Sequence, residues 1–538
     1  MRKPLNEKGV ILIVAMLFVA LSFAFIAGAI KWTNNEAKLT KKRNESIKAF
    51  YAAEAGAEQA LFEVRALYAG GTIPSQSALD AVSPPTISGY TFDVFNVVLN
   101  GSSFQGAITS GPYQGLQATI QPIRITSQAT STGSTQARAK VIQDVEAQFI
   151  SVFQFGVFYE EDLEVEPGPT MNFAGPVHAN GDIYLGAGSQ LNFDSYLTSA
   201  GDIFHDRKDN PGNGANGAVL INDNNGDPQD MNQSGVWLDS TQSNWATESQ
   251  TRWGGMVKSK VHGIAPLTLP IFPADPHDII ERANAGDPPQ IAAAKYENKA
   301  GLKVVDGIAT DGNGNPVTLA PGIVTNDLLY NYREGDWINI TSIDIETLRT
   351  SGQYPANGIL YVSQSGSNQA VRLVNGSQLP PNGLTVASDN SIYIQGDYNT
   401  VNKQPASIAG DAFDVLSNNW DDANSAKSLS SRRATATTIN TAVMTGNTDT
   451  VASSYNGGLE NLPRFLEDWS GGTTFTYSGA IVDLWNSEQA TGRWFYGGNF
   501  YKAPVRNWGY DTMFSDPTNM PPGTPSVQAV QRIRWSQQ

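Results

Sequence analysis

The sequence contains no cysteine among its 538 residues. A disulfide framework, a thiolate nucleophile and a cysteine-ligated metal are therefore excluded. This absence does not identify a compartment, because many exported bacterial proteins lack cysteine. Charged residues are also scarce at 16%, whereas glycine is abundant with 51 residues. Such a composition favours a β-rich, turn-rich chain, and the length predicts two to four domains.

Histidine is scarce too, and the sequence has four such residues: His178, His205, His262 and His277. None lies in a His-x-x-x-His or Glu-x-x-His spacing, so the sequence predicts no zinc site. It also lacks a Gly-x-Ser-x-Gly elbow and a phosphate-binding glycine loop followed by Lys-Ser or Lys-Thr. We therefore expect no enzyme activity, no catalytic residue and no cofactor.

The net charge is −16 and the pI is about 4.7. Residues 1–9 and 10–68 are each slightly positive, so nearly all the negative charge belongs to the rest of the chain. An acidic body repels phosphate groups, and this argues against nucleic acid as a partner.

Against this polar background, Val10 to Ile30 form one uncharged and mostly apolar run. A helix of this length spans the roughly 30 Å hydrocarbon core of a bilayer. A secretory signal peptide carries its cleavage site behind the apolar region. Here the candidate processing site, between Gly9 and Val10, lies in front of it, so cleavage would leave the span on the mature protein. The simpler alternative is a plain single-span membrane anchor.

No proline occurs between Pro4 and Pro74, and this predicts one continuous helix over residues 10–68, beyond a leader of residues 1–9. Past the membrane span, apolar residues recur at helical spacing. This spacing predicts a face that packs on a globular domain. Its members are Ile47, Phe50, Tyr51, the position of Glu54 and Ala55, Ala57, Leu61, Val64 and Tyr68.

The remaining sequence indicates β structure in three parts. Residues 75–160 alternate like an antiparallel sheet with a hairpin. In residues 161–454, Ala179–Tyr184 is echoed 20 residues later by Ser199–Phe204, with looser echoes near 390 and 410. Such a period predicts rungs of a β-helix-like body, with a polar insertion at 205–300. Residues 455–538 are rich in aromatic residues and predict an ordered cap. The expected fold class is α+β, mainly β.

Three patterns in the body are candidate sites. Asp223, Asn225 and Asp227 offer oxygen atoms at alternating positions, as calcium loops do, but the EF-hand pattern fails at Gly226 and Ser234. The similar stretch 311–315 fits a hairpin turn. Stacking of Asp182 on Asp202 would form a glycosidase-like carboxylate pair, although ladders of turn aspartates are ordinary in repeats. The many Trp and Tyr residues fit core packing better than a carbohydrate-binding platform.

The N-terminal part resembles the PilX-type minor pilins of the type IV pilus. The resemblance rests on Lys8-Gly9-Val10, the apolar helix, and the block Ala49-Phe50-Tyr51-Ala52-Ala53-Glu54-Ala55-Gly56-Ala57-Glu58-Gln59-Ala60. It is specific over roughly the first 70 residues. It extends more loosely to Arg124–Ser127, Arg138–Val141, Gly175–Asp182, Leu384–Tyr398 and Asn456–Trp469.

The resemblance implies a single-pass inner-membrane protein with an extracytoplasmic body. A prepilin peptidase would trim it, and its first helix would pack it among other pilins in a surface filament. Major pilins carry Glu at the fifth mature position, which is Val14 here. Subunits without this Glu are associated with the filament tip. The implied function is assembly priming or adhesion to a surface ligand. Two alternatives remain: a pseudopilin of a type II secretion system, and a membrane-anchored β-helix enzyme acting on polysaccharide.

Overall fold

The computed structural model describes residues 7–68, 73–133, 136–271, 273–452 and 454–538, with side chains from Val10 onward. The first six residues of the expected leader lie outside this part. A single helix, α1 (Glu7–Tyr68), is followed by a β-rich remainder, and this confirms the expected α+β, mainly β class. The helix is 62 residues long because no proline interrupts it.

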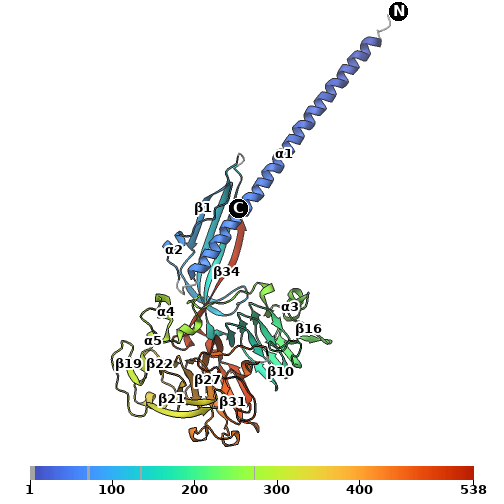
Figure 1. Cartoon of the computed structure of the whole chain (residues 1–538). Helices are drawn as coiled ribbons and strands as arrows, with labels where there is room; N and C mark the ends of the chain where they lie inside the picture. Colours follow the sequence, from blue (N-terminus) through green and yellow to red (C-terminus); the bar gives the residue numbers. More distant parts are fainter. Residues whose placement is uncertain (1–6, 69–72, 134–135, 272, 453) are drawn as a thin grey trace, which may run out of the picture.

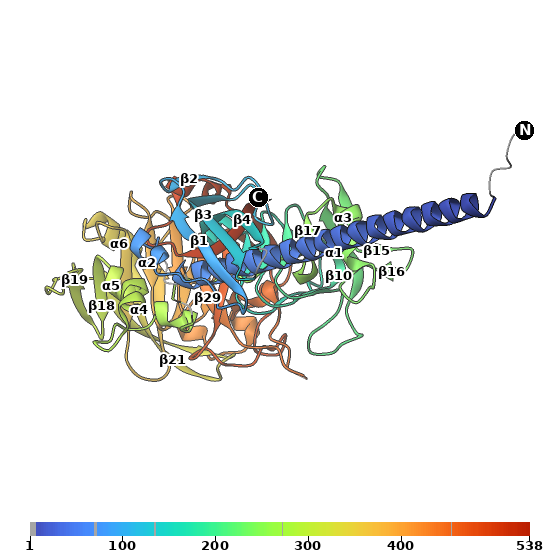
Figure 2. The same ribbon diagram turned by 90° about the horizontal axis from the view of Figure 1, so that it is seen from above.

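The first half of α1 projects from the molecule as a bare stem, and the second half lies on an antiparallel sheet (Figure 1). Seen from above, α1 crosses this sheet and continues past the edge of the body (Figure 2). The sheet has the order β1-β3-β4-β34, with β2 also paired to β3. Its strands are β1 (Tyr90–Leu99), β2 (Phe104–Ala107), β3 (Gln117–Ser131), β4 (Arg138–Ser151) and β34 (Ser526–Gln537).

The strands expected in residues 75–160 are confirmed as β1, β3 and β4, and β3 pairs with β4 over 13 residue pairs. The fourth strand has no counterpart in the sequence analysis. β34 comes from the end of the chain and pairs antiparallel with β4, from Ser526 opposite Ser151 to Gln537 opposite Val141. The whole body is thus inserted between two neighbouring strands of the sheet, at the end away from the free part of α1.

The body is built around one long sheet of 11 strands, in which all neighbours are parallel except the last pair. Two stacks meet where β5 pairs with β32. In order, the strands are β17 (Val257–Lys258), β11 (Leu197–Ser199), β8 (Val177–Ala179), β5 (Val157–Tyr159), β32 (Ile481–Asn486), β29 (Ala442–Asn447), β26 (Ala406–Ala409), β24 (Leu384–Ala387), β22 (Ile359–Ser363), β18 (Leu302–Val305) and β19 (Ile308–Asp311).

Shorter sheets form the other faces of the two stacks. Beside the first stack lie β6 (Leu163–Val165), β9 (Ile183–Leu185) and β12 (Ile203–Phe204), and a mixed sheet of β7 (Met171–Phe173), β10 (Ala187–Phe193), β13 (Asn216–Asn222) and β14 (Pro228–Asp230). Beside the second lie β20 (Val324–Asn331), β21 (Asp336–Asp344), β23 (Gln369–Val374), β25 (Ser391–Gln395), β27 (Phe413–Leu416) and β30 (Arg464–Phe465), and the parallel strands β28 (Thr437–Asn440), β31 (Thr474–Gly479) and β33 (Val505–Tyr510).

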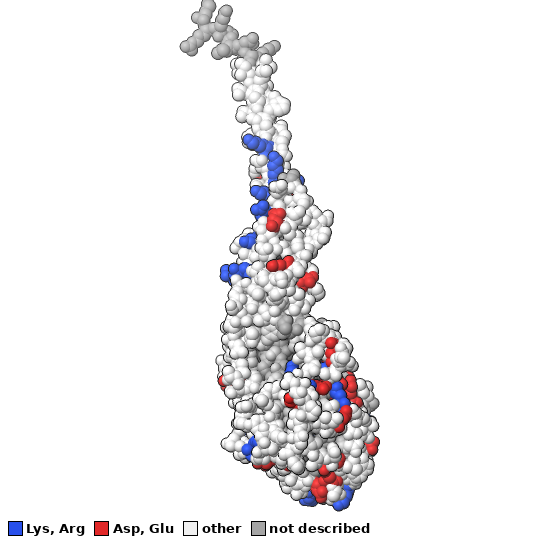
Figure 3. Space-filling model, turned by 90° about the vertical axis from the view of Figure 1, so that its left-hand side faces the viewer, with Lys and Arg blue, Asp and Glu red and all other residues white. Residues whose placement is uncertain are grey.

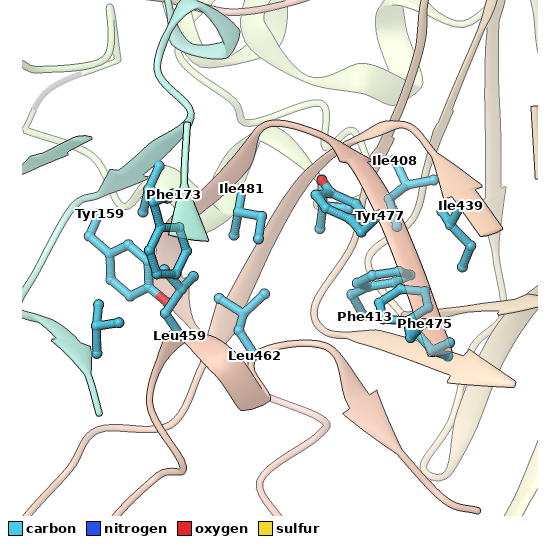
Figure 4. Close-up of a cluster of buried hydrophobic side chains, with 14 of the residues drawn as sticks. Tyr159, Phe173, Ile408, Phe413, Ile439, Leu459, Leu462, Phe475, Tyr477 and Ile481 are labelled. Atoms are coloured by element: carbon cyan, nitrogen blue, oxygen red, sulfur yellow. The ribbon is translucent and has the colours of Figure 1, made fainter. Parts of the chain in front are cut away.

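The 20-residue echo is confirmed as a stack of parallel strands. Ala179 pairs with Ser199, and Ile183 pairs with Ile203. The looser echoes also stack, since Ile392 of β25 pairs with Phe413 of β27. Because identical positions lie above one another, apolar residues form continuous columns inside the body. Figure 4 shows part of this interior, which holds Phe413 of β27, Phe475 and Tyr477 of β31, and Ile481 of β32.

The predicted insertion at 205–300 contains α3 (Trp245–Trp253), the hairpin β15 (Asn232–Gln233) and β16 (Val236–Trp237), and a strap. We use this name for residues 264–271 and 273–300, which carry α4 (Pro289–Ala294) and α5 (Tyr296–Lys299). The strap connects the body to the antiparallel sheet: Leu267 N–H donates to Asn180 at 2.7 Å, and Thr268 forms a bridge with Gln528 of β34. The small helices α2 (Gln76–Asp80) and α6 (Ile345–Thr350) complete the fold. The domain boundaries drawn from the sequence stay predictions.

Candidate assembly surface on the N-terminal helix

The apolar run of α1 makes no contact that buries it. Among the described residues, one helix is long and apolar enough to cross a membrane, and no part of its most apolar window is buried. A core helix of a soluble protein would be covered. Here Phe25 is 82% exposed, and even Val14 is 49% exposed. An uncovered apolar surface of this size indicates lipid or another apolar surface as its partner.

A cationic collar follows directly after the apolar run. Six exposed basic residues lie between Lys31 and Lys48, against two glutamates: Lys31, Lys38, Lys41, Lys42, Arg43 and Lys48. Figure 3 shows these residues along the stem, whereas acidic residues gather on the body. The charge asymmetry read from the sequence is therefore also a spatial asymmetry, with basic residues along the stem beyond the apolar run and acidic residues gathered on the body.

The second half of α1 packs on the sheet through small residues. Ala53, Ala57 and Ala60 are fully buried. Gly56 permits the closest approach, because a Cβ atom built there would lie 2.4 Å from the Ser127 hydroxyl oxygen and 2.5 Å from the Phe92 ring. The Tyr-Ala-Ala-Glu-Ala-Gly block thus provides a flat helix face that fits β1 and β3 without space for larger side chains.

The helix face expected from the sequence is partly wrong. Leu61, Val64 and Tyr68 are buried as expected, but Ile47 is 45% exposed and Tyr51 is 61% exposed. The close helix–sheet distance selects alanine and glycine for the buried side and excludes the larger residues. Tyr51 and the 65% exposed Phe62 therefore extend the uncovered apolar surface into the packed half of the helix.

Glu58 connects the helix to the two strands that flank the inserted body. Its Oε1 accepts a hydrogen bond of 3.0 Å from Gln143 of β4 and forms an ion pair with Arg532 of β34. Both Glu58 and Arg532 are partly exposed, so the pair contributes modestly to stability. Its position matters more, because it fixes the C-terminal strand against the helix.

The residues predicted for processing and assembly lie on this stem. Gly9 and Val10 belong to α1, and Val10 is 52% exposed. Val14 lies four residues further on, on the uncovered part of the same helix. Neither the structure nor the comparisons test cleavage after Gly9, which stays a prediction.

The calcium candidate forms a hairpin turn between β13 and β14. The Asp223 carboxylate accepts hydrogen bonds from the backbone N–H groups of Asn225 and Asp227, at 2.8 and 3.1 Å. These hydrogen bonds lower its pKa. Asp311 closes its turn in the same way, through Asn313 and Asn315, as the hairpin prediction requires. Both aspartates are engaged by their own turns, and calcium binding stays a prediction.

Asp182 and Asp202 do stack, as members of a ladder with Asp162. Asp162 accepts the backbone N–H of Asp182, and Asp182 accepts that of Asp202, both at 2.7 Å. Lys208 pairs with Asp162 at 2.8 Å, and Lys260 pairs with Asp202 at 2.6 Å. The lysines pair with the two end members of the ladder, and the hydrogen bonds between its aspartates hold successive turns in register. This arrangement favours the structural interpretation over a glycosidase-like pair.

Three of the four histidines have structural surroundings. His178 is fully buried among aromatic rings and hydrogen-bonds Thr198 and Asn180. His205 stacks on Trp237, and His262 hydrogen-bonds Ser249 and the Ser259 backbone. His277 alone of the four lies between carboxylates, those of Glu281 and Asp411. The sequence contained a signal for it, because His277 and Glu281 are four residues apart.

The large aromatic residues mostly pack the core. Trp245, Trp253, Trp420, Trp469 and Trp485 are buried. Trp337, on β21, is 45% exposed, and its ring lies 5.5 Å from that of Tyr330.

Comparison with known proteins finds a match among solved structures but no matching family model and no matching curated protein. Among solved structures, the chain matches the competence-associated pilin ComZ from Thermus thermophilus. The two are 12% identical, the match covers 92% of this chain and 97% of the other, and the TM-score is 0.30. At so low a TM-score, the match assigns no role to any residue.

Proposed function

We propose that this chain is a minor pilin-like component of a type IV pilus. The apolar part of α1 anchors it in the inner membrane after cleavage behind Gly9, and the same surface later packs against the helices of other pilins. The observation that carries the proposal is the continuity of α1. One helix has a first half that is uncovered and apolar and a second half that is integrated into a folded sheet. Cleavage of a signal peptide behind the apolar run would cut this helix next to the half that packs on the sheet.

The shape of the molecule supports a subunit that is present in few copies per filament. The body is much broader than the stem and lies at the end opposite the free half of α1 (Figure 1). Copies stacked at every position of a filament would have to accommodate this width, whereas a subunit at the filament end meets no such restriction. Val14 supports the same position, because it provides no carboxylate for the N-terminal amine of a neighbour.

The charge distribution supports pilins as partners. The exposed basic collar of Lys31 to Lys48 favours an acidic neighbouring surface or anionic lipid headgroups on the stem. Helix–helix association along the apolar run would rely on van der Waals packing. The role proposed for the body is adhesion or assembly priming rather than catalysis.

Immunogold labelling of sheared surface filaments tests the proposal. We expect sparse labels located at filament ends. A protein that never enters sheared filaments, and that instead cofractionates with a secretion complex in the envelope, would favour the type II pseudopilin alternative. Hydrolysis of a polysaccharide by the purified full chain would favour the enzyme alternative.

A further inference from the structure

The strap meets the body at a histidine surrounded by carboxylates. His277 lies in a short turn of 3-10 helix, Pro276–Ile279, and is buried. Its Nδ1 lies 2.9 Å from Glu281 Oε1, and its Nε2 lies 3.4 Å from Asp411 Oδ1. Glu488, from the loop after β32, completes the group. Ligand atoms of His277, Glu281 and Glu488 all lie within 4.8 Å of one another.

We propose that His277 Nδ1 and the carboxylates of Glu281 and Glu488 form a binding site for a divalent first-row transition metal, with Zn²⁺ as the natural candidate. Imidazole nitrogen and carboxylate oxygen are both ligands of Zn²⁺, whereas Ca²⁺ and Mg²⁺ prefer oxygen ligands alone. Three protein ligands leave further coordination positions, and the partly exposed Glu281 and exposed Glu488 give the ion a path from solvent.

Asp411 positions two of these three ligands, His277 and Glu488, through hydrogen bonds. The imidazole Nε2–H donates to Asp411, which leaves the Nδ1 lone pair for the metal. Metal-binding histidines characteristically have such a carboxylate partner. The same Asp411 carboxylate accepts the backbone N–H of Glu488 at 2.6 Å and that of Ala490 at 2.9 Å. Asp411 is fully buried, so it holds the imidazole and the backbone of Glu488 in fixed positions.

The local charge supports a cation. Asp411, Glu281 and Glu488 bring three carboxylates around one imidazole. Arg282, which follows Glu281 in the sequence, is engaged elsewhere, by Asp306 at 2.8 Å and by Asp389 at 3.6 Å. A divalent ion at this point offsets two of the three negative charges.

Zn²⁺ titration of the metal-stripped, detergent-solubilised full chain tests the site. Calorimetry should show saturation near one ion per chain. Substitution of Co²⁺ should give visible absorption bands that depend on His277. Glu488→Gln, an exposed change that leaves the fold intact, should weaken binding at least ~10-fold, and Asp411→Asn by about 10–100-fold.

Two matched controls account for adventitious binding. Glu248→Gln and His205→Gln repeat the same chemical changes away from the strap and should leave the affinity unchanged. His277→Gln should abolish saturable binding while circular dichroism stays that of the parent chain. The site would be refuted if Zn²⁺ binds no tighter to the parent than to Glu488→Gln. In that case His277 serves only as a charged clamp between Glu281 and Asp411.

Discussion

Gly56 of α1 faces Ser127 of β3 so closely that a Cβ atom on Gly56 would lie 2.4 Å from the serine hydroxyl oxygen. Ser127 is fully buried, and its hydroxyl has no hydrogen-bond partner in the described structure. The helix and the sheet are therefore in direct contact at this point, and the distance between them is set by the absence of one side chain.

Gly56→Ala should destabilise the protein. The added methyl group overlaps Ser127 and Phe92 at a cost of about 1–3 kcal/mol, which exceeds the gain of about 1 kcal/mol in helix propensity. Ser127→Ala removes the overlapping oxygen, so Gly56→Ala should cost less in that background. Thermal unfolding of the four proteins of this double-mutant cycle gives the coupling. Gly28→Ala is the control, since no atom lies within 4 Å of a Cβ there. Equal Gly56→Ala effects in both backgrounds would contradict the contact.

Much of the helix and the first strands can be predicted, because their signals are local. The apolar run, the missing prolines and the alternation in residues 90–151 lie in contiguous sequence. The 20-residue echo is also readable, because Ala179 and Ser199 are one turn of the stack apart. The buried helix face was predicted less well. Alanine and glycine carry little hydrophobic signal, and only the distance to the sheet makes them the buried residues.

Contacts between residues that are far apart in the sequence have no such local sequence signal. β34 pairs with β4 across the whole body, and nothing local in residues 526–537 indicates that partner. The carboxylates around His277 come from positions 281, 411 and 488, which only the packing of the strap on the body brings together. The turn aspartates show the opposite case. Their pattern was visible, but whether a carboxylate serves a ligand or its own turn depends on hydrogen bonds that the sequence does not contain.

His178 should make the free energy of unfolding depend on pH below about 6.5. Burial lowers its pKa to about 4 from 6.5, and the ring hydrogen-bonds Asn180 through Nε2 and Thr198 through Nδ1. Between these values the unfolded chain binds a proton that the folded chain does not. Stability is therefore lost as the pH falls from about 6.5 to about 4, by about 3 kcal/mol in total.

Comparison with His178→Gln isolates this contribution. Burial raises the pKa of Glu164 and Glu460 to about 7, and these groups give the opposite slope over part of the same range. They are present in both proteins, so the difference between the two thermal unfolding profiles reports His178. The variant should be less stable at pH 7 and approach the parent at pH 4. A constant difference would show that His178 is not the responsible group.

Processing should expose Val10 as the mature N-terminus. A basic segment ends in Gly9 directly before the apolar helix, so cleavage there keeps the membrane span. Intact-mass measurement on membrane-extracted protein checks this expectation, and Gly9→Trp should leave the leader attached by filling the space that a peptidase needs. A mature start beyond Ile30 would identify a cleaved signal peptide instead.

The last prediction concerns Val14, whose replacement by Glu places a carboxylate about one turn into the apolar run. At a filament end no subunit lies ahead to offer its N-terminal amine. The charge then stays unpaired, at a cost of about 2–3 kcal/mol at the membrane centre and less near its surface. Val14→Glu should therefore lower membrane insertion or filament number. In an internal subunit the carboxylate finds an amine, and the change should be tolerated or improve incorporation.

Counting filaments by electron microscopy for parent, Val14→Glu and Val14→Gln separates these outcomes. Gln has nearly the same size as Glu but no charge, so the Val14→Gln variant measures the effect of side-chain shape and polarity alone. A filament-end subunit should show a marked loss with Glu and a smaller loss with Gln. Full function of Val14→Glu, together with immunogold labels spread along the filaments, would place the protein inside the filament. The N-terminal amine, and in the variant the introduced carboxylate, would then both have partners on neighbouring subunits. The width of the body would have to be accommodated at the filament surface.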